Sequence, residues 1–553
     1  MDDDRAKTLS ERLKKLQADR VNFNTTWEKI ARVVLPTSVG FTTTYAPGTN
    51  LNQDVFDSTA QLALPRFAAA IDTLVTPQTS KWHMLAPKNR ALNRSSKVRV
   101  FMSNLNDLLF AVRYAPRANF ASRAYETYMS LGAFGNGVLY VHDARPGIRY
   151  VSVHLSEIWF DEDHNGVIDT AYWVHEYTQR QAVQKWGDKL PECIRKDVDV
   201  NPLKKVKFCK AVFPRAERDP QRRDSKNMPF ASVVFYVGDE TTVVEESGYR
   251  TFPFAVARYV TSPREVYARG PAQDALSDIL TLQEMVKTSL RYGQLVTDPP
   301  WMAADADSLD PFAVRPGAIN YGYLSPDGQE RIKPLRPQGE TGFTLELLDQ
   351  RRQAINGAFL VNLFQVLVQN GSDRKTATEV MQLVQEKGAL LGPIGGRLRT
   401  EFLGTIIERE IDILFHAGAI NPDDVPDELR DDSGLDIEYD SPLTRAIKAE
   451  EGVGILRTLE FAGQMAQFDQ GVMKKVNTGR ALERMADING APPDILFDEA
   501  EMQQKAQGDQ QAALAQQAVE AAPGIASAAK DFAQAQMLSA KAQTLTPGAA
   551  GGI

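Results

Sequence analysis

The spacing of apolar residues divides the chain into helical sections on either side of a strand-rich section. From Leu9 to Val34, and again over 58–74, 100–110 and 120–130, apolar residues recur at intervals of three and four, which predicts four helices. Pro65 lies inside the second of these helices and is expected to kink it or to delay its start. Pro36 is expected to end the first.

From Val138 the apolar spacing changes to the alternation that is typical of strands. Six short segments have this pattern, and turn residues separate them: 138–141, 148–153, 168–177, 206–213, 233–237 and 241–244. Consecutive short strands of this kind favour an antiparallel meander. Residues 1–269 are therefore predicted to form one α+β body.

Two long helices with a short insert between them are predicted next. The first runs from Pro271 to Val296, about 39 Å, and the second from near Thr344 to 370–371. Residues 299–343 between them are rich in Pro and Gly, and 319–324 and 331–335 flank a turn that predicts a hairpin. The pattern fits an ordinary helical hairpin with a decorated loop. It also fits two struts that hold a small docking element.

The remaining chain is mostly helical in pattern. Residues 376–416 are predicted to form a helix that Gly392-Pro393 and Gly395-Gly396 kink or split. An acidic loop is expected over 421–440, and a helix from Pro442 to about Phe468. From 501 to 553 the chain is rich in Ala and Gln and poor in aromatic residues. This segment is either disordered or helical when it packs against copies of itself.

Composition and charge limit the classes of function. The chain has 553 residues, 63 basic and 71 acidic, for a net charge of −8, which argues against a broad basic face that grips DNA tightly. The sequence has no apolar run long enough for a membrane span and no signal peptide. The two cysteines lack a metal-binding or redox spacing, so synthesis in a reducing cytoplasm is expected.

Two local motifs invite a chemical interpretation and favour a structural one. Asp161–Asp169 resembles the start of a calcium-binding EF-hand loop, but Tyr172 stands where a bidentate Glu is needed. A β-turn whose Asp and Asn side chains cap their own backbone is favoured instead. Gly132–Gly137 is interpreted as a helix-to-strand junction that needs positive φ, and not as a phosphate cradle. With scattered histidines and no P-loop, the sequence predicts no catalytic residue, metal or cofactor.

A basic loop precedes the predicted helix at Thr376. Arg374 and Lys375 follow Gly371-Ser372-Asp373, while Thr376 and Glu379 form a capping box at the helix start. The capping box explains Thr376 and Glu379 as structural residues. It leaves the basic pair unexplained.

The segment Arg374–Val380, which contains Thr376, Thr378 and Glu379, resembles the core signature of the head-to-tail connector (portal) proteins of short-tailed phages. The similarity extends in order over nearly the whole chain. Its further motifs are Trp27 with Leu35-Pro36, Phe56–Thr59, Thr76-Pro77 with Trp82, Gly132–Val141, Gln385-Glu386, Leu391-Gly392, Gly396–Leu398, Glu401–Leu403, Tyr439–Leu443, Val476–Thr478 and Ala491–Pro493.

This resemblance implies a ring, usually a dodecamer, at one vertex of the capsid, with a channel for packaging and ejecting the genome. It implies a portal-protein fold whose parts are a wing at 1–269, a first stem helix at 270–298, a clip at 299–343, a second stem helix at 344–371, a tunnel loop and long kinked helix at 372–420, a helical crown at 421–500 and a C-terminal barrel or tail at 501–553.

The resemblance also implies contacts. Arg374 and Lys375 would touch the phosphates of double-stranded DNA without reading its sequence. Trp301, Tyr321 and Tyr323 would either dock partners at the clip or fill the clip's own core. The implied partners are the terminase large subunit, then tail adaptor and nozzle proteins, and also the scaffold, the major capsid protein and internal core proteins.

The implied location is the portal vertex of the virion, after assembly in the host cytoplasm, with no membrane partner and no enzymatic activity. Two other hypotheses remain open at this stage. One is a metal-dependent hydrolase or nuclease that uses the 161–169 turn. The other is a helical adaptor without a channel.

Overall fold

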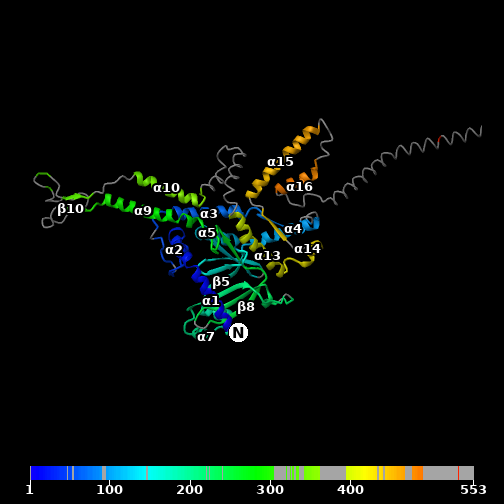
Figure 1. The fold of residues 1–553 in the computed structure, drawn as a ribbon, viewed down its shortest axis with the longest axis horizontal. Coiled ribbons are helices and arrows are strands. Elements are labelled where there is room, and N and C mark those ends of the chain that lie inside the picture. The colour runs from blue at the N-terminus through cyan, green and yellow to red at the C-terminus, as the bar shows by residue number, and fades with distance from the viewer. Residues whose placement is uncertain are drawn as a thin grey trace, which may run out of the picture. The chain divides into compact units, whose positions relative to one another are not determined.

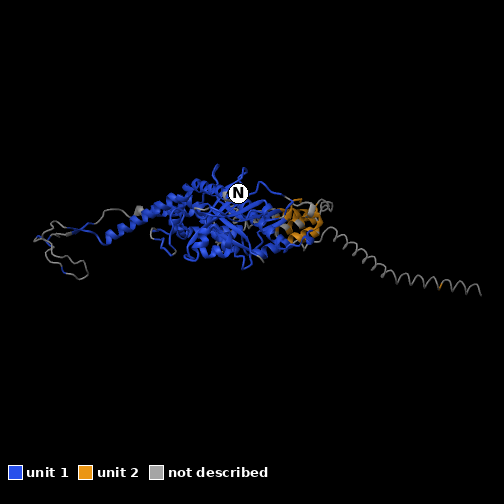
Figure 2. Ribbon diagram, turned by 90° about the horizontal axis from the view of Figure 1, so that it is seen from below, with its two compact units in different colours: residues 1–85, 104–425, 436–451 blue, residues 86–103, 426–435, 452–553 orange. Residues whose placement is uncertain are grey.

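A computed structural model describes most of the chain in two compact units (Figures 1 and 2). The first unit comprises 1–85, 104–425 and 436–451, and the second comprises 86–103, 426–435 and 452–553. The described residues are 2–46, 48–52, 55–89, 92, 95–144, 147–219, 221–222, 224–238, 241–303, 319, 324, 327–328, 332–335, 342–361, 394–431, 435–439, 442–466, 476–489 and 534.

Five helices dominate the N-terminal part of the chain. They are α1 (Asp2–Asp19), α2 (Val21–Val34), α3 (Thr59–Val75), α4 (Ser96–Arg113) and α5 (Phe120–Phe134). The single helix expected over 9–34 is divided at Arg20, whose buried side chain donates to the Ile158 carbonyl at 2.5 Å. Helix α3 already begins at Thr59, so Pro65 lies inside it and does not delay its start.

Five strands form a sheet in which each strand pairs antiparallel with the next along the chain. They are β4 (Ile158–Glu162), β5 (Ile168–Thr178), β6 (Lys205–Pro214), β7 (Phe230–Tyr236) and β8 (Val243–Tyr249). The predicted meander is confirmed for four of its six strands, 168–177, 206–213, 233–237 and 241–244, while 138–141 and 148–153 belong to another sheet. Between β5 and β6 lie α6 (Gln179–Trp186) and α7 (Glu192–Asp197).

Both faces of this sheet are buried, and side chains that are neighbours in sequence serve different cores. Cys209 joins Leu9 and Leu13 of α1 on one face, while Phe208 joins Trp186 of α6 on the other. Period-2 geometry places successive side chains on opposite faces, so one strand supplies both clusters. Helix α1 therefore lies against the sheet through its apolar stripe.

A second, three-stranded sheet has the order β3-β2-β9, from β2 (Asn136–Asp143), β3 (Ile148–Val153) and β9 (Phe254–Arg258). Sequence reasoning missed β4 and β9. Strand β9 is buried at all five positions, so it has no polar alternation to reveal it. Its pairing with β2 also interrupts the simple consecutive order that the pattern predicted.

Gly135 ends α5 and begins the passage into β2. Its φ of +76° is left-handed, as expected for a helix-to-strand junction, so the structural interpretation of Gly132–Gly137 is confirmed. An added Cβ atom would lie 2.5 Å from the Arg269 carbonyl carbon and 2.5 Å from the Gly270 nitrogen. The backbone at Gly135 therefore passes very close to the backbone at 268–270. At this crossing the Asn136 side chain exchanges two hydrogen bonds of 2.9 Å with the Ala268 backbone.

The predicted helix at 271–296 is divided at Ala275 into α8 (Pro271–Asp274) and α9 (Leu276–Thr297). Its partner α10 (Gly342–Ala358) ends earlier than expected, because Leu360 turns to a φ of +56°. Phe359 is buried just before this turn, with its ring 6.4 Å from that of Phe67. The prediction of one continuous helix is therefore wrong at 359–360, and its extension over 362–370 lies outside the described residues.

The later elements partly agree with the pattern. They are a π-helical turn (Leu398–Leu403), α13 (Gly404–His416), α14 (Asp427–Asp431), β12 (Leu435–Tyr439), α15 (Pro442–Ala466) and α16 (Thr478–Asn489). Helix α15 confirms the prediction from Pro442. The loop expected over 421–440 is wrong where α14 and β12 form, and β12 pairs with β1 (His83–Pro87). No helix among the described residues is long and apolar enough to span a membrane.

Candidate functional site

Helices α9 and α10 pack against each other, and a short ribbon lies at the end where α9 finishes and α10 begins (Figure 1). The ribbon pairs β10 (Trp301–Ala303) antiparallel with β11 (Ile332–Pro334). The second strand of the predicted hairpin is thus present, but its described partner is β10. Ile319 and Leu324 belong to no named strand. Helix α9 is about 33 Å long at 1.5 Å per residue.

The half of this helix pair nearest the ribbon has several exposed apolar side chains, although Leu348 of α10 is buried. On α9 only Ile279, Leu282 and Gln283 are buried, all in its first third. Exposed apolar side chains follow on α9, β10, the end of β11 and α10: Leu290, Leu295, Val296, Trp301, Met302, Leu335 and Leu345. Leu290 is 54% exposed and Leu345 is 61% exposed. Such a density of exposed apolar residues is typical of an interaction surface.

The other end of the helix pair is fixed to the body by polar contacts. The Gln283 amide oxygen accepts from the Phe56 and Asp57 nitrogens at 2.7 and 2.9 Å, and its nitrogen donates to the Asp57 carbonyl at 2.7 Å. From α10, Arg352 donates two hydrogen bonds of 3.0 Å to the Asp57 carboxylate. Burial would raise the pKa of Asp57, but hydrogen bonds from Thr59 and Arg352 hold it below its ordinary value.

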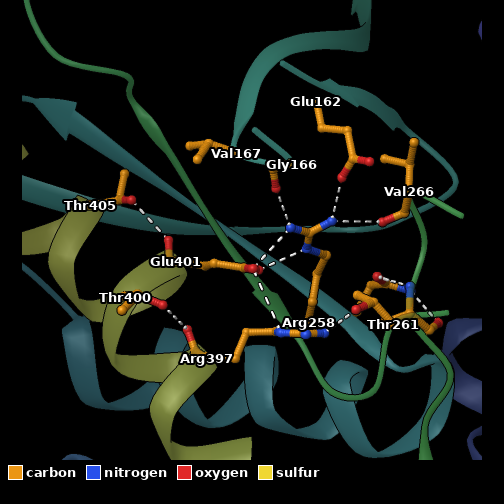
Figure 3. A network of polar contacts seen from close by, with 12 residues as sticks. Glu162, Gly166, Val167, Arg258, Thr261, Val266, Arg397, Thr400, Glu401 and Thr405 are labelled. Atoms are coloured by element: carbon orange, nitrogen blue, oxygen red, sulfur yellow. Dashed lines mark hydrogen bonds and ion pairs between the residues drawn. The ribbon is translucent and has the colours of Figure 1, made fainter. Parts of the chain in front are cut away.

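A buried arginine side chain holds four segments of the first unit together (Figure 3). Arg258, at the end of β9, donates to both Glu401 oxygens at 2.7 and 2.9 Å and to Glu162 at 2.9 Å. It also donates to the carbonyls of Gly166 at 2.9 Å and Val266 at 3.2 Å. These five hydrogen bonds match the five N–H donors of a guanidinium.

The π-helical turn at 398–403 presents Glu401 to this arginine. Leu398, Phe402 and Leu403 of the same turn are buried, and the Phe402 ring lies 6.0 Å from Tyr128. Arg397 on the preceding turn donates to the Thr261 hydroxyl. These contacts fix the π-helical turn to the rest of the first unit.

A second buried ion pair holds α13 to the body. Arg113 of α4 and Glu410 of α13 are 0% and 1% exposed, and they share hydrogen bonds of 2.9 and 2.5 Å. The Tyr150 hydroxyl donates to the same carboxylate, and Arg113 donates to the His83 Nε2 atom at 2.8 Å. Burial, and then the Arg113 charge, lower the pKa of His83 to about 2, so its ring is neutral and can accept.

The turn that resembles an EF-hand loop is occupied by its own hydrogen bonds. Asp163 Oδ1 accepts from the nitrogens of Asn165 and Val167, both at 2.9 Å, and Gly166 has a φ of +79°. This confirms the self-capped β-turn that the sequence favoured. Within the described part of the chain, no group of three or more His, Cys, Asp or Glu side chains is placed to hold a metal ion.

The structure places one of the site residues predicted from the sequence. Trp301 lies on β10 opposite Pro334 and is 42% exposed. The remaining predicted residues lie outside the described part of the chain: Tyr321, Tyr323, Arg374, Lys375, Thr376, Thr378 and Glu379.

Sequence reasoning missed the pairing of Arg258 with Glu401 and the role of Gln283. Its one usable signal was a lone Arg that closes the apolar run at 254–258.

Comparisons with known proteins give a consistent family. The family model described as "Bacteriophage head to tail connecting protein" matches residues 6–496. The chain is similar to the "Probable portal protein" of Bordetella phage BPP-1, at 27% identity over 95% of each chain. It is also similar to the "Portal protein" of Salmonella phage epsilon15, at 26% identity over 99% of each.

Two solved structures are also similar to parts of the chain. The first, titled "Neck of empty GTA particle computed with C6 symmetry", is 12% identical with a TM-score of 0.33, over 72% of this chain and 89% of that one. The second, titled "Virion of native gene transfer agent (GTA) particle", is 13% identical with a TM-score of 0.33, over 75% and 90%. Because the family model covers most of its length, this chain belongs to the bacteriophage head-to-tail connecting proteins, the family of portal proteins.

Proposed function

We propose that twelve copies of this chain close into a ring at one capsid vertex and form the channel through which the genome is packaged and later ejected. The observation that carries this proposal is the exposed apolar half of the α9–α10 pair. Fully burying one such side chain stabilises by about 1.5–3 kcal/mol, so a few of them per contact suffice to hold neighbouring copies together. In a closed ring, every copy buries this apolar surface against its neighbours.

In this proposal the helix pair is the stem of the channel, and the residues around β10 and β11 form the clip. The clip docks the terminase large subunit during packaging, and afterwards the tail adaptor and nozzle proteins. Exposed Trp301 supports a docking role, because aromatic side chains are enriched at binding anchors. Residues 1–269 form a wing that meets the scaffold and the major capsid protein. The crown at 421–500 and the C-terminal segment after 500 meet internal core proteins.

Ring assembly is expected to depend on the exposed leucines of α9. Replacing Leu290 and Leu295 together with glutamate puts charges where the copies meet, so native mass spectrometry should show monomers instead of a ring near twelve subunits. The monomer should still fold, because both side chains are already exposed.

A matched control is glutamate at Val200 and Leu203, each 75% exposed, which should leave the ring intact. Rings that persist in the α9 variant, or a wild-type chain that stays monomeric at micromolar concentration, would contradict the proposal.

We also propose that Arg374 and Lys375 face the channel and contact DNA phosphates. With a net charge of −8 the channel wall would be largely repulsive, which lets DNA slide, while one basic loop per copy gives a ring of cations. Arg374 is the better phosphate ligand because of its planar donor fork.

Alanine at both Arg374 and Lys375 is expected to leave rings and procapsids intact and to reduce the amount of DNA packaged or retained, whatever its sequence. Packaged DNA per procapsid can be measured after nuclease treatment. Alanine at Lys205 and Lys207, two exposed lysines on β6, is the matched control and should package normally. Full-length genomes held at wild-type yield by the first variant would refute the assignment.

A further inference from the structure

A cleft of about 970 Å³ opens on the first unit. Three parts of the chain line it: helices α1 and α2, strands β4 and β5, and the segment 264–273 that leads into α8. This volume is in the range of ligand-binding clefts. Neither the ring nor the DNA channel proposed above uses it.

The floor of the cleft is aromatic. The Tyr267 ring lies 4.5 Å from Phe160 and 5.6 Å from Phe23, and Tyr267 and Phe160 are buried. All three residues line the cleft. Phe23 is the partly exposed ring of the three, so it is the surface that can receive an apolar or aromatic side chain of a ligand, because aromatic rings pack edge-to-face or offset against each other.

The cleft carries cations that lack carboxylate partners. Among the described residues, neither Arg12 and Lys15 on α1 nor Arg264 forms an ion pair. Arg264 is also held at a φ of +72°, an uncommon conformation for a residue other than glycine. The acidic residues of the lining are partly occupied: Glu265 pairs with Arg269 at 2.7 Å, and Asp161 accepts from the Glu162 nitrogen at 3.0 Å.

A further positive charge lies directly behind the floor. The Arg20 guanidinium is 5.5 Å from the centre of the Tyr267 ring and 4.5 Å from that of Trp159, and its side chain is 1% exposed. Its hydrogen bonds go to the Ile158 carbonyl and to the Asn24 amide oxygen, not to a carboxylate. A buried cation in a low-dielectric site adds to the field in the cleft, and this field favours an anionic ligand.

The lining also contains buried acceptors without donors. Glu265 Oε2 and Gln273 Oε1 are inaccessible to water and accept no hydrogen bond, and the hydroxyl of buried Tyr172 makes none in good geometry, although Arg12 lies close to it. Buried polar atoms are almost always paired in folded proteins. A ligand with N–H groups would satisfy these acceptors only when the Glu265 and Gln273 side chains turn toward the cleft.

This combination separates two classes of ligand. A nucleic-acid backbone offers only acceptors, so it has no N–H group for Glu265 or Gln273. A polypeptide offers backbone N–H groups, carboxylates for Arg12 and Lys15, and a side chain for the aromatic floor.

We propose that this cleft binds an acidic segment of a partner protein, with a carboxylate against Arg12 and Lys15 and a neighbouring apolar side chain on the Phe23, Phe160 and Tyr267 floor. The partner is a protein other than this chain. The two cations of the proposed contact, Arg12 and Lys15, lie on α1, a different element from the α9–α10 pair.

The test uses the full-length assembled protein and a short fluorescein-labelled peptide that alternates aspartate with leucine and phenylalanine, followed by fluorescence anisotropy. The peptide should bind in the micromolar range, and added salt should weaken it. Glutamate at both Arg12 and Lys15 should weaken binding at least about tenfold, because it removes both contacts with the peptide's carboxylates and puts negative charges in their place. Both residues are exposed on α1, so the fold should persist.

Two controls make the result specific. Glutamate at Lys7 and Lys14, also exposed on α1 but outside the cleft, makes the same change of charge and should leave binding within about twofold of wild type. The same peptide with asparagine in place of aspartate should bind as weakly as the aspartate peptide binds the cleft variant.

Equal binding by both charge-reversed variants would overturn the proposal, as would full competition by a DNA oligonucleotide. If the Arg12 and Lys15 variant instead loses its ring mass while the Lys7 and Lys14 variant keeps it, the occupant is a neighbouring copy and the partner assignment is wrong. The mass of the wild-type ring, recorded in the same experiment, tests the proposed function separately.

Discussion

Replacing Glu410 with glutamine is expected to lower the free energy of unfolding by about 3–5 kcal/mol, because it leaves the fully buried Arg113 guanidinium without a counter-charge. Glutamine keeps the size of the side chain and part of its hydrogen bonding, so the loss reports mainly the missing charge. Urea unfolding of the full chain at one fixed concentration, followed by circular dichroism, measures the change.

The matched control removes a similar charge at the surface. Glutamine at Glu126, whose carboxylate accepts from exposed Arg123 at 2.8 and 2.9 Å, should cost no more than about 1 kcal/mol. Methionine at Arg113 combined with leucine at Glu410 should recover part of the loss, since it removes both charges together. Equal costs at Glu410 and Glu126 would contradict the assignment of a fully desolvated pair.

Alanine at Gly135 should be comparably severe, at about 3 kcal/mol. The new Cβ would lie 2.5 Å from backbone atoms of Arg269 and Gly270, which cannot move as a flexible side chain does, and overpacking costs about 1–3 kcal/mol. The left-handed φ adds about 1–2 kcal/mol. Thermal unfolding and the yield of assembled ring should both fall, because this crossing sets where α8 and α9 leave the body.

Gly418 separates the two contributions. It also has a positive φ, +73°, but nothing lies within 4 Å of an added Cβ. Alanine there should cost only about 1–2 kcal/mol, from the backbone conformation alone. If alanine at Gly135 and at Gly418 destabilised the protein equally, the close approach of the two backbones would not be the reason for glycine at Gly135.

The sequence predicted the elements whose side chains alternate or recur over many residues. Strands β5 and β6 are long, and helix α15 starts at a proline, so their patterns are local and strong. Strand β9 was missed because all five of its positions are buried. The end of α10 was missed because Leu360 adopts a left-handed φ, which tertiary packing of Phe359 imposes and no local signal announces.

The same distinction between local patterns and long-range contacts applies to the candidate site. The basic pair Arg374 and Lys375 was found from its place in a family motif, and its DNA contact stays a prediction. The contact of Arg258 with Glu401 joins residues 143 positions apart, and no periodicity links them. The cleft was also invisible in the sequence, since its lining comes from three separate parts of the chain that only the folded sheet brings together.

The long sequence separation of the two buried arginine pairs has a consequence for synthesis on the ribosome. Arg113 precedes Glu410 by 297 residues, and at about 5–20 residues per second it waits roughly 15–60 s for its partner to be made. Until α13 emerges, Arg113 has no counter-charge, so burying its guanidinium is unfavourable and the N-terminal part of the nascent chain stays loosened. The N-terminal part of the chain therefore finishes folding only after α13 has been synthesised. Chains truncated before α13 cannot reach the fully folded state.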